Sequence, residues 1–123
     1  MKSRSDLGYF GQDLAVKFLQ DRGYLVLDQN FQKPWGEIDV ICQKGEVIVF
    51  VEVKTNKKEM VGFEPESRVN HNKISRMIRT ARTYLAYRKL PDYQEWRIDV
   101  VAVTINKDRG VARIRHYLNI DTQ

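Results

Sequence analysis

Two carboxylates and one ammonium group lie beside or within apolar stretches of the sequence, where charged side chains are costly unless they are paired or used. Glu52 and Lys54 follow the apolar run 47–51, and Asp39 interrupts the apolar run 38–42. In a strand, residues i and i+2 share one face, so Glu52 and Lys54 would project together, roughly 7 Å apart. Asp is disfavoured in strand interiors, and its presence at position 39 therefore needs a reason.

These residue types suit the metal-assisted hydrolysis of a phosphodiester. Carboxylates from neighbouring strands offer the hard oxygen ligands that Mg²⁺ prefers, with several waters kept around the ion. Such an ion polarises a phosphate and lowers the pKa of an attacking water. We therefore predict that Asp39 and Glu52 are catalytic ligands of Mg²⁺ or Mn²⁺. Lys54 is predicted to orient the water or to offset charge in the transition state. Glu37 shares a face with Asp39, so it either contacts a metal-bound water at the edge of the site or belongs to a turn.

The apolar pattern predicts elements in the order α-β-β-β-α-β-β. Helices are expected at 6–22 and 73–90, strands at 24–30, 37–43, 46–54, 96–104 and 111–118, and loops at 31–35 and 55–72. The tight turn Lys44–Gly45 predicts an antiparallel hairpin. The helix at 73–90 would form a crossover that makes the next strand a parallel neighbour. The expected fold class is therefore α/β, with a mixed central sheet flanked by helices.

The hairpin also predicts where Asp39 should lie. Counting back from the turn Lys44–Gly45 places Asp39 level with residues 49–51, give or take one register step. A bend in the strand would bring it beside Glu52. Strand 46–54 is nearly continuous in apolar residues, which predicts a position in the middle of the sheet with both faces covered.

Composition sets loose bounds on function. The 123 residues are expected to form one domain. Lys plus Arg number 21 against 16 Asp plus Glu, and the net charge of +5 weakly favours a polyanionic partner. The single cysteine, Cys42, excludes an internal disulfide, and no Cys/His cluster has zinc spacing. A polar N-terminus and the lack of a long apolar run predict a cytoplasmic protein with no membrane partner.

The helix predicted at 73–90 has a strongly basic outer face. It contains no acidic residue, so it offers no i,i+4 ion pair to neutralise that face. Charge of one sign favours contact with nucleic-acid phosphates. The residues predicted to make such contacts are Lys73, Arg76 and Arg79 of the helix, with Lys58 and Arg68 of the preceding loop.

Two other residues stand out from their surroundings. Trp35 lies beside Gly36, next to the predicted site, and is the better of the two tryptophans to touch a base, although packing is its commoner role. Asp99 interrupts an apolar strand much as Asp39 does. We expect a structural role for Asp99, in a pair with Arg97 or with a loop amide.

The ordered set formed by Asp39 and the run Glu52-Val53-Lys54 resembles the PD-(D/E)XK nuclease signature. The runs GEIDVI (36–41), VFVEVKT (49–55) and RIDVV (97–101), with Lys73 heading a helix, resemble the YraN-type family of uncharacterised bacterial proteins. That family is similar to archaeal Holliday junction resolvases and to restriction endonucleases. The resemblance covers the chain from Gly8 to about Leu118.

This resemblance implies a single PD-(D/E)XK nuclease-like domain over residues 1–123, with a restriction-endonuclease-like αβββαβ core. It implies a metal-dependent endonuclease that hydrolyses DNA, structured or branched DNA included. The backbone carbonyl of Val53 would be a further metal ligand. A homodimer is also implied, because a junction resolvase must cut two strands.

One position departs from the family pattern. Such families usually carry a Glu in a G-x-x-G-E context, where this chain has Gly8-Tyr9-Phe10-Gly11-Gln12. Gln12 keeps an oxygen ligand at the edge of the site but loses a charge. The change allows reduced or absent activity, so a nucleic-acid-binding module without catalysis is the alternative. A structural or protein-interaction domain with ordinary ion pairs is a third interpretation.

Overall fold

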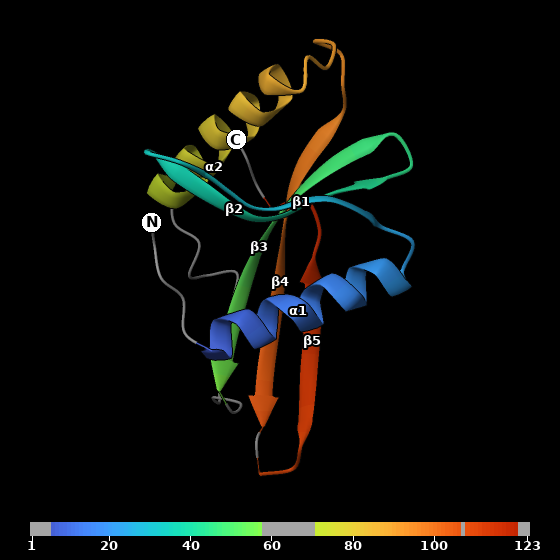
Figure 1. Ribbon diagram of the computed structural model, residues 1–123, viewed down its shortest axis with the longest axis vertical. Helices are drawn as coiled ribbons and strands as arrows, with labels where there is room; N and C mark the ends of the chain where they lie inside the picture. The colour runs from blue at the N-terminus through green and yellow to red at the C-terminus, as the bar shows by residue number, and fades with distance from the viewer. Residues whose placement is uncertain (1–5, 58–70, 107, 121–123) are drawn as a thin grey trace.

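The computed structural model describes residues 6–57, 71–106 and 108–120, and Figure 1 shows their arrangement. The elements are α1 (Asp6–Asp21), β1 (Leu25–Lys33), β2 (Gly36–Lys44), β3 (Val47–Lys57), α2 (His71–Tyr87), β4 (Trp96–Asn106) and β5 (Val111–Tyr117). The strands form one five-stranded sheet in the order β1-β2-β3-β4-β5. Only β3 and β4 are parallel, and the other neighbouring pairs are antiparallel. The predicted α/β class and the restriction-endonuclease-like order of elements are confirmed.

The two helices pack on opposite faces of the sheet. The first helix ends before Gly23, whose φ of +88° suits a residue without a side chain. The amides of Gly23 and Tyr24 donate to the carbonyls of Gln20 and Leu19, both at 3.0 Å, which closes the helix end and directs the chain into β1. Neither helix in the described residues is long and apolar enough to span a lipid bilayer.

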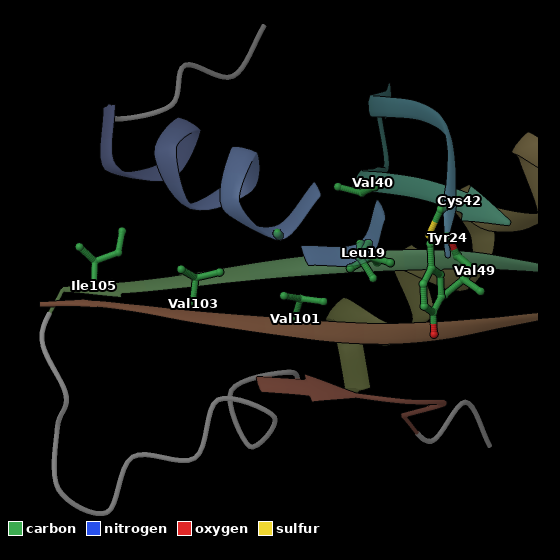
Figure 2. Packing of buried hydrophobic residues seen from close by; sticks show 10 residues of the cluster. Leu19, Tyr24, Val40, Cys42, Val49, Val101, Val103 and Ile105 are labelled. Carbon is green, nitrogen blue, oxygen red and sulfur yellow. Dashed lines mark hydrogen bonds between the residues drawn. The ribbon is translucent and has the colours of Figure 1, made fainter. Parts of the chain in front are cut away.

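Alternation along β3 supplies a core on each face of the sheet. Val49 and Val51 pack in the cluster that contains Leu19 of α1. Phe50 packs in the cluster that contains Tyr84 of α2. Figure 2 shows the α1-side cluster, with Leu19 close to the ribbon of β3. Burying each such side chain stabilises the fold by roughly 1.5–3 kcal/mol, so cover on both faces fixes β3 in the middle of the sheet.

Strand pairing extends β1 and β3 into stretches that the sequence predicted as loops, and β2 and β4 are also longer than predicted. The strand expected at 24–30 continues through Lys33, because Phe31–Lys33 pair with the start of β2. The predicted loop at 31–35 is therefore wrong, and a tight turn at Pro34–Trp35 replaces it. The third strand continues to Lys57, into the predicted loop at 55–72, because β4 pairs with it that far.

The second helix is also displaced from its predicted range. It begins at His71 and ends at Tyr87, instead of spanning 73–90. The remainder of the predicted loop, residues 58–70, lies outside the described residues, and so do Lys58 and Arg68.

Candidate active site

The candidate site lies where β2 separates from β3. Pairing between these strands ends at Val40 and Val51, and the next residues along them are Asp39 and Glu52. From there β2 follows β1, so the β1–β2 hairpin diverges from β3 (Figure 1). The Asp39 carboxylate accepts a hydrogen bond from the Val53 amide at 2.7 Å and replaces the lost strand partner. The turn lies at residues 45–46, one residue later than predicted, and Lys44 pairs with Val47. This register places Asp39 level with Glu52, one step beyond the predicted residues 49–51, so no bend is needed to bring the two together.

Glu52 is nearly buried and has two cationic neighbours. Its side chain is 7% exposed, and Lys73 Nζ lies 2.6 Å from its Oε2. Lys54 Nζ lies 3.6 Å from the same oxygen. Lys54 belongs to the face of β3 that the sequence indicated, whereas Lys73 comes from the first turn of α2. The structure thus groups the predicted residues and adds Lys73, which the sequence assigned to nucleic-acid contact.

The contact of Lys73 with Glu52 was missed because it joins elements that are distant in the sequence. One local signal pointed to it. The first turn of α2 contains no acidic residue. A cation near a helix N-terminus opposes the helix dipole, so Lys73 needs a carboxylate from another element. Nothing in the sequence specifies which carboxylate that is.

Burial and like charge perturb the ionisation of these groups. Burial raises the pKa of the Asp39 carboxyl to about 7, and the Glu52 carboxylate adds to the shift, against the hydrogen bond from the Val53 amide. Burial lowers the pKa of Lys54, and the nearby Lys73 ammonium adds to this effect against the attraction of Glu52. Burial also acts to lower the pKa of Lys73, but contact with Glu52 outweighs it and raises that pKa. Perturbed groups concentrated in a cavity are typical of functional sites.

A cavity of about 390 Å³ opens beside these groups, between the β1–β2 turn and the first half of α2. Its volume is within the range of roughly 300–1,000 Å³ that ligand sites occupy. Its acidic lining residues come from β2 and β3, and its basic ones come from β1 and α2. The lining residues are Gln32, Lys33, Pro34, Trp35, Gly36, Glu37, Asp39, Glu52, Lys73, Arg76 and Met77.

Comparison with known proteins gives this arrangement a family. The chain matches the model of the uncharacterised protein family UPF0102 over residues 11–103, from α1 into β4. It belongs to this family. A UPF0102 protein of Clostridium beijerinckii is 38% identical, over 94% of this chain and 92% of that protein. A UPF0102 protein of Dictyoglomus thermophilum is 30% identical, over 95% of this chain and 98% of that protein. One from Fervidobacterium nodosum is 39% identical, over 89% of this chain and 77% of that protein. The YraN-type resemblance is thereby confirmed.

The two residues predicted at the edge of the site have different positions in this UPF0102 chain. Glu37 lines the cavity, and Gln32 Nε2 donates to its Oε1 at 3.5 Å. Gln12 is 4% exposed on α1 and is not among the residues that line the cavity. Its Nε2 donates to Oε1 of Gln29 on β1 at 2.9 Å. Only Glu37 is therefore placed to meet a ligand in the cavity.

The three described basic residues that were predicted to contact nucleic acid have different surroundings. Arg76 is exposed and lines the cavity. The guanidinium of Arg79 lies 4.0 Å from the centroid of the Trp35 ring, in a cation–π contact. Lys73 is directed to Glu52. The helix therefore contributes to the cavity wall as well as to the basic surface.

The donor set suits a hydrated cation better than an ion fully enclosed by protein. Within the described residues, no group of three or more His, Cys, Asp or Glu is arranged to hold a metal ion. Mg²⁺ commonly uses only one or two carboxylates and keeps several waters. Asp39 and Glu52 meet that requirement, and the Lys73 ammonium already occupies part of their negative field. The residues present therefore fit a partly hydrated divalent cation.

Proposed function

We propose that this UPF0102 chain is a metal-dependent endonuclease that hydrolyses phosphodiester bonds in DNA, with structured or branched DNA among its substrates. The observation that supports this most strongly is that Asp39 and Glu52 line one cavity, with Lys54 Nζ 3.6 Å from Glu52 Oε2. Their order in the sequence is that of the PD-(D/E)XK signature. Lys73 and Arg76 of α2 line the same cavity and add positive charge, which suits a phosphate.

The side chains would divide the work of binding and orientation. Asp39, Glu52 and the Val53 carbonyl would hold Mg²⁺ or Mn²⁺. The metal, when bound, supplies Lewis-acid polarisation of the phosphate and an acidified water. Lys54 would orient the attacking water and offset negative charge as the bond to phosphorus forms. Lys73 holds the Glu52 carboxylate in place through its 2.6 Å contact.

The direct test is cleavage of branched, nicked and single-stranded DNA in the presence of Mn²⁺ or Mg²⁺. The wild-type protein is expected to cut at least one of these substrates. Asp39→Ala should lower the rate by about 1,000-fold or more, since a metal ligand is lost. Product analysis on denaturing gels measures both rates.

A matched control separates this effect from contamination and unfolding. Asp13 is an exposed aspartate on α1, outside the cavity lining, so Asp13→Ala should cleave like the wild type. If neither protein cuts anything that Asp39→Ala leaves intact, the nuclease proposal fails.

The second candidate function is nucleic-acid binding without catalysis. It is favoured by Gln12, which replaces the family glutamate and bonds to Gln29 instead of facing the cavity. This function predicts DNA binding that weakens steeply with salt, because phosphate contacts release counterions. Salt-dependent binding without cleavage in any divalent metal would favour this candidate over the enzyme.

The homodimer implied by the family resemblance is part of the same proposal. Two active sites are needed to cut two strands of a branched substrate. Sedimentation velocity with and without a four-way DNA junction measures the stoichiometry. A single protein chain on each cut junction would contradict the dimer but not the nuclease.

A further inference from the structure

We infer that the end of the cavity formed by the β1–β2 turn receives an unpaired base beside the scissile phosphate, so that the preferred DNA is single-stranded or unstacked at the cleavage point. The inference rests on the proposed nuclease function and names its substrate class. Trp35 is the residue that carries it.

Trp35 is held in place by α2 from two directions. The Arg79 guanidinium lies 4.0 Å from its ring centroid. Its neighbour Gly36 packs so tightly on the helix that an added Cβ would lie 2.6 Å from Thr80 Oγ1 and 3.2 Å from the Arg76 carbonyl oxygen. The turn therefore has little freedom to move, and the indole ring is a preformed surface. Ordering an aromatic side chain before binding reduces the entropic cost of stacking a ligand on it.

Trp35 borders the space in which a ligand would lie. It is among the residues that line the cavity, whereas Arg79, whose guanidinium lies over the ring, is not. The Trp35 Nε1 atom is buried and has no hydrogen-bond partner among the described residues. Buried donors are normally satisfied. An acceptor on a ligand seated against Trp35 would satisfy this one after a small movement of the ring.

The size and charge of the cavity fit one nucleotide. Its volume of about 390 Å³ accommodates a single base with its sugar far better than a double helix. Lys33 and Arg76 line the same cavity and offer positive charge to the phosphate groups on either side of such a base. Asp39 and Glu52 line the same cavity, and the metal would neutralise them.

Stacking on a tryptophan requires a base whose face is free. In continuous duplex DNA the bases are stacked on their neighbours, and an enzyme must extrude one at a cost before it can enter a pocket. Bases in single strands and at branch points are already unstacked, and aromatic stacking is tolerant of sequence. The cavity therefore favours DNA structure over DNA sequence.

Binding measured by the fluorescence of Trp35 tests this inference without any need for catalysis. The chain contains two tryptophans, so Trp96→Phe leaves Trp35 as the sole reporter. The substitution keeps an aromatic ring against Phe50, which Trp96 contacts edge-on. In EDTA, which prevents metal-dependent cleavage, a single-stranded pentanucleotide should quench Trp35, and a hairpin duplex of the same composition should quench it much less.

Substitutions then separate stacking from charge. Trp35→Ala should weaken binding of the single strand by about ten-fold or more and change duplex binding less than two-fold. Trp35→Phe keeps a smaller ring but removes the N–H, so its loss should be intermediate. Tyr93→Ala, which removes an aromatic side chain that is 86% exposed and outside the cavity lining, should have no effect.

The outcomes distinguish this inference from the proposed function. Equal losses on both DNA forms, or no quenching of Trp35, would overturn the base site even if the protein cleaves DNA. If the protein binds single-stranded DNA selectively but never cleaves DNA, the nuclease proposal is rejected and the base site is supported. If circular dichroism shows that Trp35→Ala is unfolded, Trp35→Phe and Trp35→Leu provide the comparison.

Discussion

Asp39 and Asp99 stand in nearly the same local sequence, in EIDVI and RIDVV, yet the fold gives them opposite surroundings. Asp39 lines the cavity on the α2 side of the sheet. Asp99 is completely buried on the α1 side, where alternation along β4 places it with Val101. Each interrupts an apolar strand, so the difference between them comes from the partners that the other elements provide.

Asp99 is a fully satisfied carboxylate. Its oxygens are contacted by His116 Nε2 at 2.7 Å, by Arg97 Nε at 3.0 Å and by the Asn119 amide at 2.8 Å. Burial alone would raise the pKa of Asp99, but these hydrogen bonds outweigh it and lower the pKa. The predicted structural role is confirmed, with both Arg97 and a loop amide as partners.

Asp39, in contrast to Asp99, has few partners that stabilise its charged form. One backbone amide bonds to it, while the Glu52 carboxylate repels it, and its pKa rises to about 7. A fold that can satisfy an aspartate as completely as it satisfies Asp99 keeps Asp39 short of positive charge. Asp99 therefore stabilises the structure, whereas Asp39 is the carboxylate to which our proposal assigns a cation.

The largest expected effect comes from removing the satisfied carboxylate. Asp99→Ala should destabilise the protein by about 3–5 kcal/mol, because it leaves Arg97 without its buried counter-charge. Urea unfolding followed by circular dichroism measures the change. The matched change Asp92→Ala, at an exposed position, should cost less than about 0.5 kcal/mol. A loss below 1 kcal/mol for Asp99→Ala would contradict the structural role.

The next largest effect is a gain in stability, expected when Asp39 is replaced. With a pKa raised from 3.8 to about 7, folded Asp39 holds a proton that the unfolded chain releases, so this group lowers stability as pH rises from about 4 to 7. Asp39→Asn removes that cost and keeps an oxygen for the Val53 amide. In EDTA at pH 8 the variant should be more stable than the wild type by about 1–2 kcal/mol.

A pH series makes the comparison between the two residues sharper. The advantage of Asp39→Asn should vanish below about pH 3, where the wild-type carboxyl, with a pKa of 3.8 in the unfolded chain, is protonated in both states. The lowered pKa of Asp99 contributes stability above pH 3.8 that is lost at more acidic pH. An Asp39→Asn variant that is less stable than the wild type at pH 8 would show that Asp39 is a structural residue like Asp99.

The smallest effect is expected from Lys73, the cation nearest to Glu52. Lys73→Met removes an ammonium group that competes with a divalent ion for this carboxylate. Mn²⁺ should bind the variant about ten-fold more tightly than it binds the wild type, as measured by calorimetry. Exposed Lys17, whose partner Asp21 lies on the surface of α1, gives the control Lys17→Met. Unchanged or weaker Mn²⁺ binding would show that Lys73 does not compete with the metal.

The sequence predicted the sheet well because its strands carry strong local signals. Alternation and continuous apolar character placed β3 in the centre. The predicted turn Lys44–Gly45 indicated its antiparallel pairing with β2, although the turn lies one residue later, at residues 45–46. The end of β1, in the β1–β2 hairpin, was harder to predict. Residues 31–33 are polar apart from Phe31, and they are strand only because β2 pairs with them. Such pairing is a tertiary effect that no local pattern reveals.

The site was predicted as far as it lies on adjacent strands. Asp39, Glu52 and Lys54 follow from strand periodicity and the order of residues, because β2 and β3 are neighbours in the sequence. Lys73 reaches Glu52 only after the crossover that carries α2 onto the sheet. His116, in contrast, reaches Asp99 from β5, which follows β4 in the sequence and pairs with it in the sheet. Contacts between distant elements depend on packing angles that residue patterns do not encode.

The contact of Gly36 with Thr80 determines the distance between the β1–β2 turn and α2, the two elements on either side of the cavity. Gly36 lies against the Thr80 hydroxyl and the Arg76 carbonyl oxygen of α2 and has no side chain of its own, so a hydrogen atom of the glycine sets the spacing of the two walls. A methyl group at this point would push the two walls apart without changing any charge that lines the cavity. The cavity could therefore be widened by evolution, or by design, through one uncharged substitution.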